Sequence, residues 1–326
     1  MQSILRSGRQ RRLLLVAALA AAVHGPALAQ STRPPQRNAP PSWPTRPVRI
    51  LLAYPAGGVS DLIARELAEL VSTQLSMPVF VENRPGASGT LAMDLVARSP
   101  ADGYTLGFGA ATAVALLASM GQRDGKTLPV TPVAGVMRTP VLVVGTSALQ
   151  ASTFTGMLAQ ARTDSGGIRW ATTGEGTTGH SVLERVRRAS GAHIIHIPYK
   201  GGGQQLNDAL GGHFEVLSTN VAPQQLEAIK SGRFTALAVG APERLPVLPD
   251  VPTLAELGFA RANLDSLFGL FAPPGTPEGI VARINAEVAL ALRNTSLRTK
   301  LLAASNTPYT GSAAEFAAQV RLEAER

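Results

Sequence analysis

The sequence predicts an α/β fold built on largely parallel sheets. Between Val48 and Phe108, short apolar runs of strand-forming residues alternate with segments of helical period, in the order strand, helix, strand, helix, strand. A second alternating set follows between residues 154 and 239. Two short strands, Val133–Val136 and Val141–Val144, stand between the sets and flank Arg138-Thr139-Pro140. We expect the chain to cross there from one α/β unit to another.

The first unit begins with a strand, a glycine turn and a helix. Val48 to Ala53 is the strand, Pro55-Ala56-Gly57-Gly58 interrupts it, and Ser60 or Asp61 caps the helix that follows. Such a turn directs unpaired backbone N–H groups and the positive end of a helix dipole at one point, and glycine lets a ligand approach closely. The stretch predicts an anion site, although a βα turn without a ligand has the same pattern.

The same two periods place the other elements. We expect further helices at 91–98, 110–120, 154–162, 180–189, 204–210, 223–231, 278–293 and from Ser312 onward, and further strands at 79–82, 104–108, 168–172, 193–197, 214–218, 235–239 and 267–271. Proline and glycine mark their limits: Pro100 ends a helix, Gly211-Gly212 closes another, and Pro273 to Pro277 opens the helix that begins at 278.

Residues 1–29 are typical of a cleavable secretory signal. Four arginines precede the apolar stretch Leu13 to Val23, which is too short to span a bilayer, and Ala27-Leu28-Ala29 is a cleavage pattern. A membrane anchor is the alternative. Residues 30–47 contain six prolines and are expected to form a stiff linker. We therefore expect an exported protein that resides in the periplasm.

Composition excludes several functional classes. The chain of 326 residues has no cysteine, which excludes disulfides, thiolate metal sites and a cysteine nucleophile. Removing the four arginines of the signal lowers the formal net charge from +8 to +4. The remaining charge is scattered and lacks basic runs, so nucleic acid is not an expected partner. A mildly positive exported protein favours small anions.

Six motifs in order resemble those of one family. They are Tyr54-Pro55-Ala56-Gly57-Gly58-x-x-Asp61, Val81-Glu82-Asn83-Arg84-Pro85-Gly86-Ala87, Asp102-Gly103-Tyr104-Thr105-Leu106, Pro198-Tyr199-Lys200-Gly201, Leu248-Pro249-Asp250-Val251-Pro252-Thr253 and Ala272-Pro273-x-Gly275-Thr276-Pro277. From about Trp43 to Arg326 the chain thus resembles the Bug family, the substrate-binding proteins of tripartite tricarboxylate transporters. The resemblance implies a two-lobed fold like that of periplasmic binding proteins (a Venus flytrap), with each lobe a mostly parallel sheet flanked by helices.

The resemblance also implies an organisation and a function. Lobe 1 is expected to comprise 48–138 plus 266–326 and lobe 2 to comprise 139–265, with hinges near Arg138 to Pro140 and near Asp265 to Leu267. The expected function is to capture a small organic carboxylate between the lobes and deliver it to the membrane components of a tripartite tricarboxylate transporter. We expect a monomer without enzymatic activity, cofactor or metal. The same receptor feeding a sensor is an alternative that the sequence leaves open.

Candidate ligand-binding residues come from both lobes. In lobe 1 they are Tyr54, Ala56, Gly57, Gly58, Ser60 and Asp61. In lobe 2 they are Thr173, Gly174, Thr177, Thr178, Tyr199, Lys200, Gly201 and Asn220. The resemblance implies that backbone N–H groups and bridging waters of the first loop hold a carboxylate while Asp61 steadies that loop. The lobe 2 hydroxyls and the start of the following helix suit a second carboxylate or an amide.

Two of the lobe 2 side chains have alternative interpretations. For Lys200 a solvated surface position is an equal alternative to ligand contact. For His180 helix packing or bracing of the loop is favoured over ligand contact. Members of the family often carry Asp-Asn where this chain has Thr219-Asn220, which favours a plain mono- or dicarboxylate over an amino acid. Members also usually continue past the position of Arg326, so we expect a shorter final helix.

An exported NAD-dependent enzyme is the competing class. Gly174-x-Gly176-x-x-Gly179 has the form of a dinucleotide-binding fingerprint between a strand and a helix. That fingerprint requires an acid at the end of the next strand, and here this strand ends Ile197-Pro198-Tyr199-Lys200. The chain contains neither G-x-S-x-G nor H-E-x-x-H, and His193 and His196 lack helical metal-ligand spacing.

Overall fold

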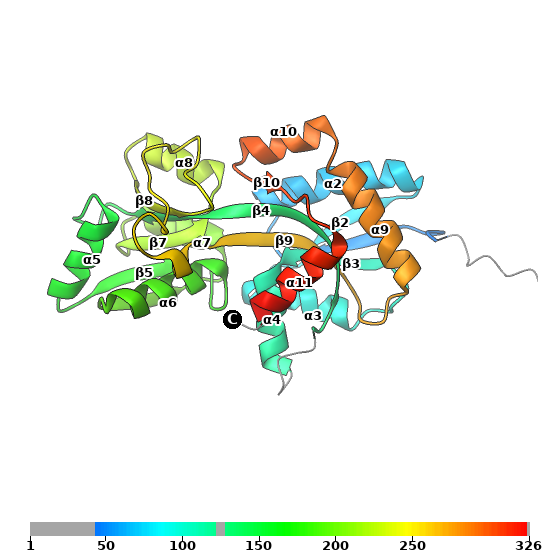
Figure 1. Ribbon diagram of the computed structural model, residues 1–326, viewed down its shortest axis with the longest axis horizontal. Helices are drawn as coiled ribbons and strands as arrows, with labels where there is room; N and C mark the ends of the chain where they lie inside the picture. Colours follow the sequence, from blue (N-terminus) through cyan, green and yellow to red (C-terminus); the bar gives the residue numbers. More distant parts are fainter. Residues whose placement is uncertain (1–42, 122–127, 325–326) are drawn as a thin grey trace, which may run out of the picture. The chain divides into compact units, whose positions relative to one another are not determined.

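Strands from distant parts of the chain join into one sheet. The computed structural model describes residues 43–121 and 128–324, and within them ten strands hydrogen-bond in a single sheet (Figure 1). The predicted signal and residues 30–42 of the predicted linker lie outside the described residues. Residues Pro44 to Arg326 form one compact unit.

The first half of the sheet has helices on both faces. Its strands are the parallel β2 (Val79–Asn83), β1 (Val48–Leu52) and β3 (Thr105–Ala110), followed by the antiparallel β9 (Asp265–Ala272). One face carries α2 (Val59–Leu75), α9 (Glu278–Ala291) and α10 (Thr295–Ala303), and the other carries α3 (Thr90–Ala97), α4 (Ala111–Gly121) and α11 (Ala313–Ala324) (Figure 1). Met93, Val114 and Phe316 of the second group are buried in one apolar cluster with residues of β1 and β9.

The second half repeats this arrangement. Its parallel strands are β7 (Val216–Asn220), β5 (Ile168–Thr172) and β6 (Ile194–Pro198), and β8 (Thr235–Gly240) pairs with β4. One apolar cluster contains residues of α5 (Phe154–Thr163) and α6 (Thr178–Ser190), and a second contains residues of α7 (Gly202–Leu210) and α8 (Pro223–Lys230). Neighbouring residues of β4, Val143 and Leu142, enter different clusters because side chains alternate across a strand.

β4 (Thr131–Gly145) corrects one prediction, because it is a single strand and not two short ones. Its first part pairs with β9, and from Val141 onward it pairs with β7 and β8. Pro140 stands where the partners change. Proline lacks an N–H, but the Pro140 carbonyl still accepts from Val221 N at 3.0 Å, so the strand continues through the proline. Pro140 also lies opposite Asp265, the first residue of β9.

Most predicted elements are present with shifted ends, and α10 was missed. Asn294 caps α10 by accepting from Leu297 N at 3.2 Å, and Leu297 and Leu301 are buried. The short β10 (Thr307–Pro308) follows and pairs with β4. An Asn cap ahead of two leucines four residues apart was the available signal. Within the described ranges, no helix has the length and apolarity needed to cross a bilayer.

Candidate ligand-binding cleft

A cleft of about 410 Å³ lies where the starts of α2, α4, α6, α7 and α8 meet the crossing strands. Its walls come from the β1–α2 loop, residues 85–89, the start of α6, the start of α7 and residues at the end of β7. β4 contributes Met137 and Thr139, and β9 contributes Ser266 and Phe268. The lining is therefore drawn from both halves of the sheet.

Most of the residues predicted from the sequence meet at this cleft. Those in its lining are Tyr54, Ala56, Gly57, Gly58, Ser60, Thr173, Thr177, Thr178, Lys200, Gly201 and Asn220. Asp61, Gly174 and Tyr199 lie outside the lining. Tyr199 turns its hydroxyl away to donate to Asp208 Oδ2 at 2.7 Å, and its ring packs on Phe214.

Asp61 holds the β1–α2 loop in place through hydrogen bonds. Its carboxylate accepts from Gly57 N at 3.0 Å, from Asn83 Nδ2 at 2.8 Å and from Arg65 Nε at 3.1 Å. Asn83 Nδ2 also donates to the Tyr54 carbonyl at 3.0 Å. Burial raises the pKa of Asp61, but the hydrogen bonds from Arg65, Asn83 and Gly57 outweigh burial and hold the pKa below its ordinary value. The buried carboxylate is thus ionised and holds the loop in one shape.

The loop that Asp61 braces presents unpaired backbone donors. Gly58 is the N-cap of α2 and has no side-chain cap, and within the described residues the N–H groups of Gly58, Val59 and Ser60 have no hydrogen-bond partner. Gly57 reaches this geometry with a φ of 84°, where glycine is favoured. Three donors and the positive end of a 17-residue helix therefore face the cleft.

Tyr54 forms the floor beside this loop. Its hydroxyl accepts from Ala110 N at 3.2 Å, and its ring lies 5.6 Å from that of Phe268. Burial raises the pKa of the Tyr54 phenol well above its ordinary value, against a smaller lowering by the Ala110 N–H. The phenol therefore stays neutral, and its O–H can donate a hydrogen bond to a ligand oxygen.

The opposite wall is held by hydroxyl groups at the start of α6. Thr177 caps the helix by accepting from His180 N at 3.3 Å, and its Oγ1 donates to the Gly174 carbonyl at 2.8 Å. Ser266 Oγ of β9 lies 2.9 Å from Thr178 Oγ1 and 2.7 Å from Asn220 Oδ1. A chain of polar contacts thus links α6 and β7 to a strand of the other half of the sheet.

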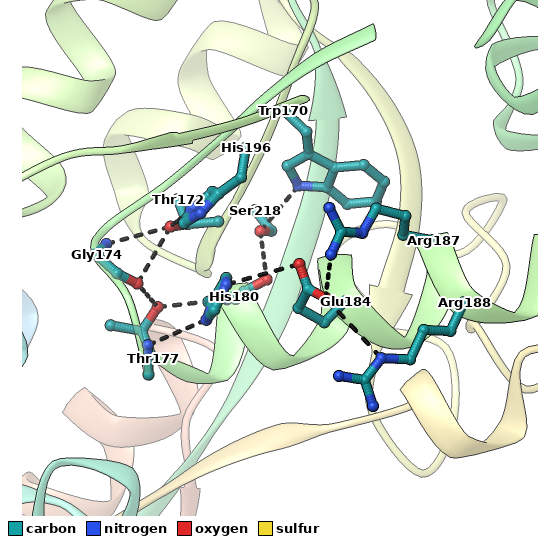
Figure 2. Close-up of polar contacts among 12 residues, drawn as sticks. Trp170, Thr172, Gly174, Thr177, His180, Glu184, Arg187, Arg188, His196 and Ser218 are labelled. Carbon is teal, nitrogen blue, oxygen red and sulfur yellow. Dashed lines mark hydrogen bonds and ion pairs between the residues drawn. The ribbon is translucent and has the colours of Figure 1, made fainter. Parts of the chain in front are cut away.

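His180 braces the residues just before α6. Its Nδ1 accepts from Gly176 N at 3.1 Å, and its ring stacks on that of His196 (Figure 2). Neither histidine belongs to the cleft lining. The favoured prediction for His180, a loop-bracing role, matches these contacts. The part of His196 was not foreseen, because only the parallel pairing of β5 and β6 brings it beside α6.

Lys200 differs from every other lining residue in its charge. Among the described residues that line the cleft, it is the only one with a charged side chain, and its ammonium forms no ion pair within the described part of the chain. It lies two residues after the end of β6, at the carboxyl end of parallel strands, where α/β proteins bind ligands.

The cleft lining also contains residues that the sequence did not predict, among them Ser88, Thr112, Thr139, Gln224, Gln225, Ser266, Phe268 and Asn306. Ser88 had a signal, because it stands between Gly86 and Gly89. Ala87 and Ser88 adopt φ values of 47° and 55°, which non-glycine residues rarely do. No local sequence signal marks Ser266, Thr139 and Asn306, because pairing between distant strands brings them to the cleft.

Packing accounts for the three glycines of the G-x-G-x-x-G pattern. A Cβ at Gly174 would overlap Ser88 Oγ, and one at Gly176 would lie 2.8 Å from a methyl carbon of Leu116. A Cβ at Gly179 would lie 2.9 Å from the Ser218 carbonyl oxygen. These close approaches require glycine without any dinucleotide. Within the described residues, no group of three or more His, Asp or Glu side chains is placed to hold a metal ion.

The crossed α/β sheet with a polar cleft between its halves defines a solute-binding protein of the periplasmic type. Residues 63–326 match the family described as the tripartite tricarboxylate transporter family receptor, and the chain belongs to this family. This family membership confirms the resemblance to Bug proteins. The family is one of solute-binding receptors.

Three relatives illustrate the similarity. BugT of Bordetella pertussis is 33% identical over 272 residues, which cover 82% of each chain. The structure of MatC from Rhodopseudomonas palustris with bound malate is 29% identical, with a TM-score of 0.75, and the match covers 87% of this chain and 98% of that one. The R. palustris Rpa4515 structure with adipate is 31% identical, with a TM-score of 0.75, over 87% of this chain and 95% of that one.

Proposed function

We propose that the protein is a periplasmic receptor that captures a small organic carboxylate in the cleft and delivers it to the membrane components of a tripartite tricarboxylate transporter. The main support for the proposal is the β1–α2 loop. Its unpaired N–H groups at Gly58, Val59 and Ser60 suit a carboxylate, and no side-chain anion occupies that place. The malate and adipate in the two R. palustris relatives support the same ligand class.

The lining favours binding over catalysis. Among the described lining residues there is no histidine, aspartate or glutamate, so the cleft lacks the side chains that most often act as general acid or base. It offers backbone N–H groups, hydroxyls, amides and one ammonium. These groups can hold and orient an anion without chemical change, and we infer that the protein is not an enzyme.

The charge of the lining favours a plain carboxylic acid over an amino acid. An α-ammonium group needs an anionic partner when it is desolvated, and the lining contains no carboxylate. Thr219, a neutral side chain, is part of the lining. Lys200 can instead pair with a second carboxylate. A mono- or dicarboxylate is therefore the proposed ligand.

A thermal-shift screen of the exported form, without residues 1–29, tests the proposal. Organic mono- and dicarboxylates, including malate and adipate, are compared with amino acids, neutral sugars and amines at millimolar concentration. A ligand that binds the folded state at 1,000 times its Kd adds about 4 kcal/mol of stability, so carboxylates should raise the Tm by several degrees. Stabilisation by sugars or amines alone would contradict the carboxylate assignment.

A further inference from the structure

His180 and His196 form a stacked imidazole pair behind the second wall of the cleft. Their ring centroids lie 4.4 Å apart with an interplanar angle of 22° (Figure 2). His180 is the third residue of α6, and His196 projects from β6. Both side chains are partly buried, and neither lines the cleft. Direct ligand contact is therefore not their role in this structure.

Each ring holds one part of the loop 173–177. Gly176 N donates to His180 Nδ1 at 3.1 Å, so this nitrogen must carry a lone pair. His196 Nε2 lies 2.8 Å from Thr172 Oγ1, which also accepts from Gly174 N at 3.3 Å. The loop therefore has a direct hydrogen bond to His180 and an indirect contact with His196 through Thr172, and Thr173 and Thr177 of this loop line the cleft.

Protonation acts differently on the Gly176–His180 hydrogen bond and on the Thr172–His196 contact. A proton on His180 Nδ1 would face the Gly176 N–H with a second donor, so this hydrogen bond cannot survive. The hydroxyl of Thr172 can accept as well as donate, so its contact with His196 tolerates either state. Two charged rings at stacking distance would also repel each other. Acid therefore acts on the loop mainly through His180.

The charged groups around the pair come from the loop and from α6. Glu184 Oε1 lies 3.8 Å from His180 Nε2 and favours protonation, as does Glu175. Arg187 opposes it, and both Arg187 and Arg188 lie within ion-pair distance of Glu184 (Figure 2). The side chains of β5 and β7 that Figure 2 draws around the pair, those of Thr172, Trp170 and Ser218, carry no charge.

Burial favours the neutral form of both rings. Burial lowers the pKa of His180 below its ordinary value, and the attraction of Glu184 and Glu175 only partly offsets this effect. Burial also lowers the pKa of His196, and charge on His180 lowers it further. A histidine whose pKa is lowered in the folded state makes that state less stable as the pH falls below about 6.5, which is the ordinary pKa of histidine.

We propose that His180 and His196 are positioning residues for the loop 173–177, and that their protonation on acidification loosens this loop and weakens ligand binding. The loop's response to pH depends only on the geometry, whereas its effect on affinity rests on the proposed function. The consequence is a receptor that holds carboxylates more tightly at neutral than at mildly acidic pH.

Amide hydrogen exchange in the ligand-free exported protein tests the loop's response. The protection factor of the Gly176 N–H should fall when the pH is lowered from 7.5 to 5.5. His180→Asn keeps an acceptor at the place of Nδ1 and does not titrate, so its Gly176 protection should not change with pH. His193→Gln removes an exposed histidine and should behave as the native protein does. Constant Gly176 protection in the native protein would overturn the proposal.

Adipate titrations by calorimetry test the effect on affinity. The native protein and His193→Gln should bind adipate more weakly at pH 5.5 than at pH 7.5, by less than about tenfold, because the lowered pKa of His180 leaves part of the protein neutral at pH 5.5. Between the two pH values, the affinity of the double variant His180→Asn/His196→Gln should change only as far as the titration of adipate itself requires. An equal pH dependence in native and double variant, or tighter native binding in acid, would overturn the proposal. If adipate and the screened carboxylates do not bind at all, the proposed function fails while hydrogen exchange still decides the loop's response.

Discussion

At the scale of residues, the first wall of the cleft depends on one carboxylate and one glycine. Asp61 is 4% exposed and accepts hydrogen bonds from the loop that it holds. Gly58 lies above it with a φ of −78°, and an added Cβ would meet only the Pro55 carbonyl oxygen, at 3.9 Å. Asp61 therefore acts on shape, while the absence of a side chain at Gly58 leaves room for a ligand.

Replacing Gly58 by valine should abolish binding without unfolding the protein. The backbone angles suit any residue, and the side chain has room, but it would stand beside the N–H groups that a carboxylate would approach. We expect an unchanged Tm and an affinity for the best carboxylate of the screen reduced by more than tenfold. Gly279→Ala, at another position where a Cβ meets no neighbour, is the control and should bind normally. Normal binding by Gly58→Val would place the carboxylate elsewhere.

Removing the Asp61 carboxylate should destabilise the protein in a pH-dependent manner. Asp61→Ala leaves the Gly57 N–H without its acceptor and Asn83 Nδ2 with only the Tyr54 carbonyl among the described residues, which costs about 1–3 kcal/mol at pH 7. Because the folded-state pKa of Asp61 is lowered, its contribution is complete above about pH 4 and is lost as the pH falls further. Urea unfolding between pH 7 and pH 3 should show the native protein and the variant converging in acid. A constant difference would contradict this assignment.

At the scale of elements, β4 and β9 are the two strands that join the halves of the sheet. Arg138 of β4 donates to Asp265 Oδ1 of β9 at 2.6 Å and to Gln319 Oε1 of α11 at 2.6 Å. The Arg138 and Asp265 side chains are 33% and 17% exposed, so this ion pair is partly shielded from water. The contact links the place where β4 changes partners to the last helix.

Breaking this ion pair should cost more than breaking an exposed one. Among the described residues, Asp265→Ala leaves the guanidinium of Arg138 with only Gln319 as a partner, and the variant should lower the free energy of unfolding by about 1–2 kcal/mol. Asp94→Ala removes an ion pair within α3 whose arginine is 77% exposed, and should cost less than about 0.5 kcal/mol. Urea denaturation of both variants measures the contrast. Equal losses would show that the crossing pair has no special weight.

At the scale of the whole molecule, the cleft exists only because two α/β halves share strands. Its lining combines the β1–α2 loop with the start of α6, and Ser266 of β9 contacts Thr178 and Asn220. We propose the lobe limits 48–138 plus 266–326 and 139–265, with a hinge where β4 and β9 run between them. A ligand that contacts both lobes can then stabilise a closed form.

Small-angle scattering of the exported form should detect this closure. The radius of gyration should decrease on saturation with the best carboxylate of the screen, because closing a hinge brings the two lobes together. Gly58→Val at the same ligand concentration is the control and should give the radius of the unliganded protein. An unchanged radius in the saturated native protein would exclude a hinge closure, while leaving the carboxylate assignment intact.

The sequence by itself determined the elements and the first wall of the cleft. Glycine turns, helix caps and the alternation of strands and helices are local signals, and the β1–α2 loop with its N–H donors is a local structure. These features were predictable because each arises from interactions within about ten residues. The role of Asp61 as a loop brace came instead from the resemblance to the Bug family, and one of its partners, Asn83, lies 22 residues away in the chain.

Tertiary structure alone decided which residues from distant parts of the sequence meet at the cleft. Pairing of β4 with β9 brings Thr139 and Ser266 to the cleft, and parallel pairing of β5 with β6 stacks His196 on His180. Tyr199 was predicted as a ligand-binding residue, but in the fold its hydroxyl donates a hydrogen bond to Asp208. Contacts between residues far apart in sequence follow from strand order and register, which side-chain periodicity does not encode.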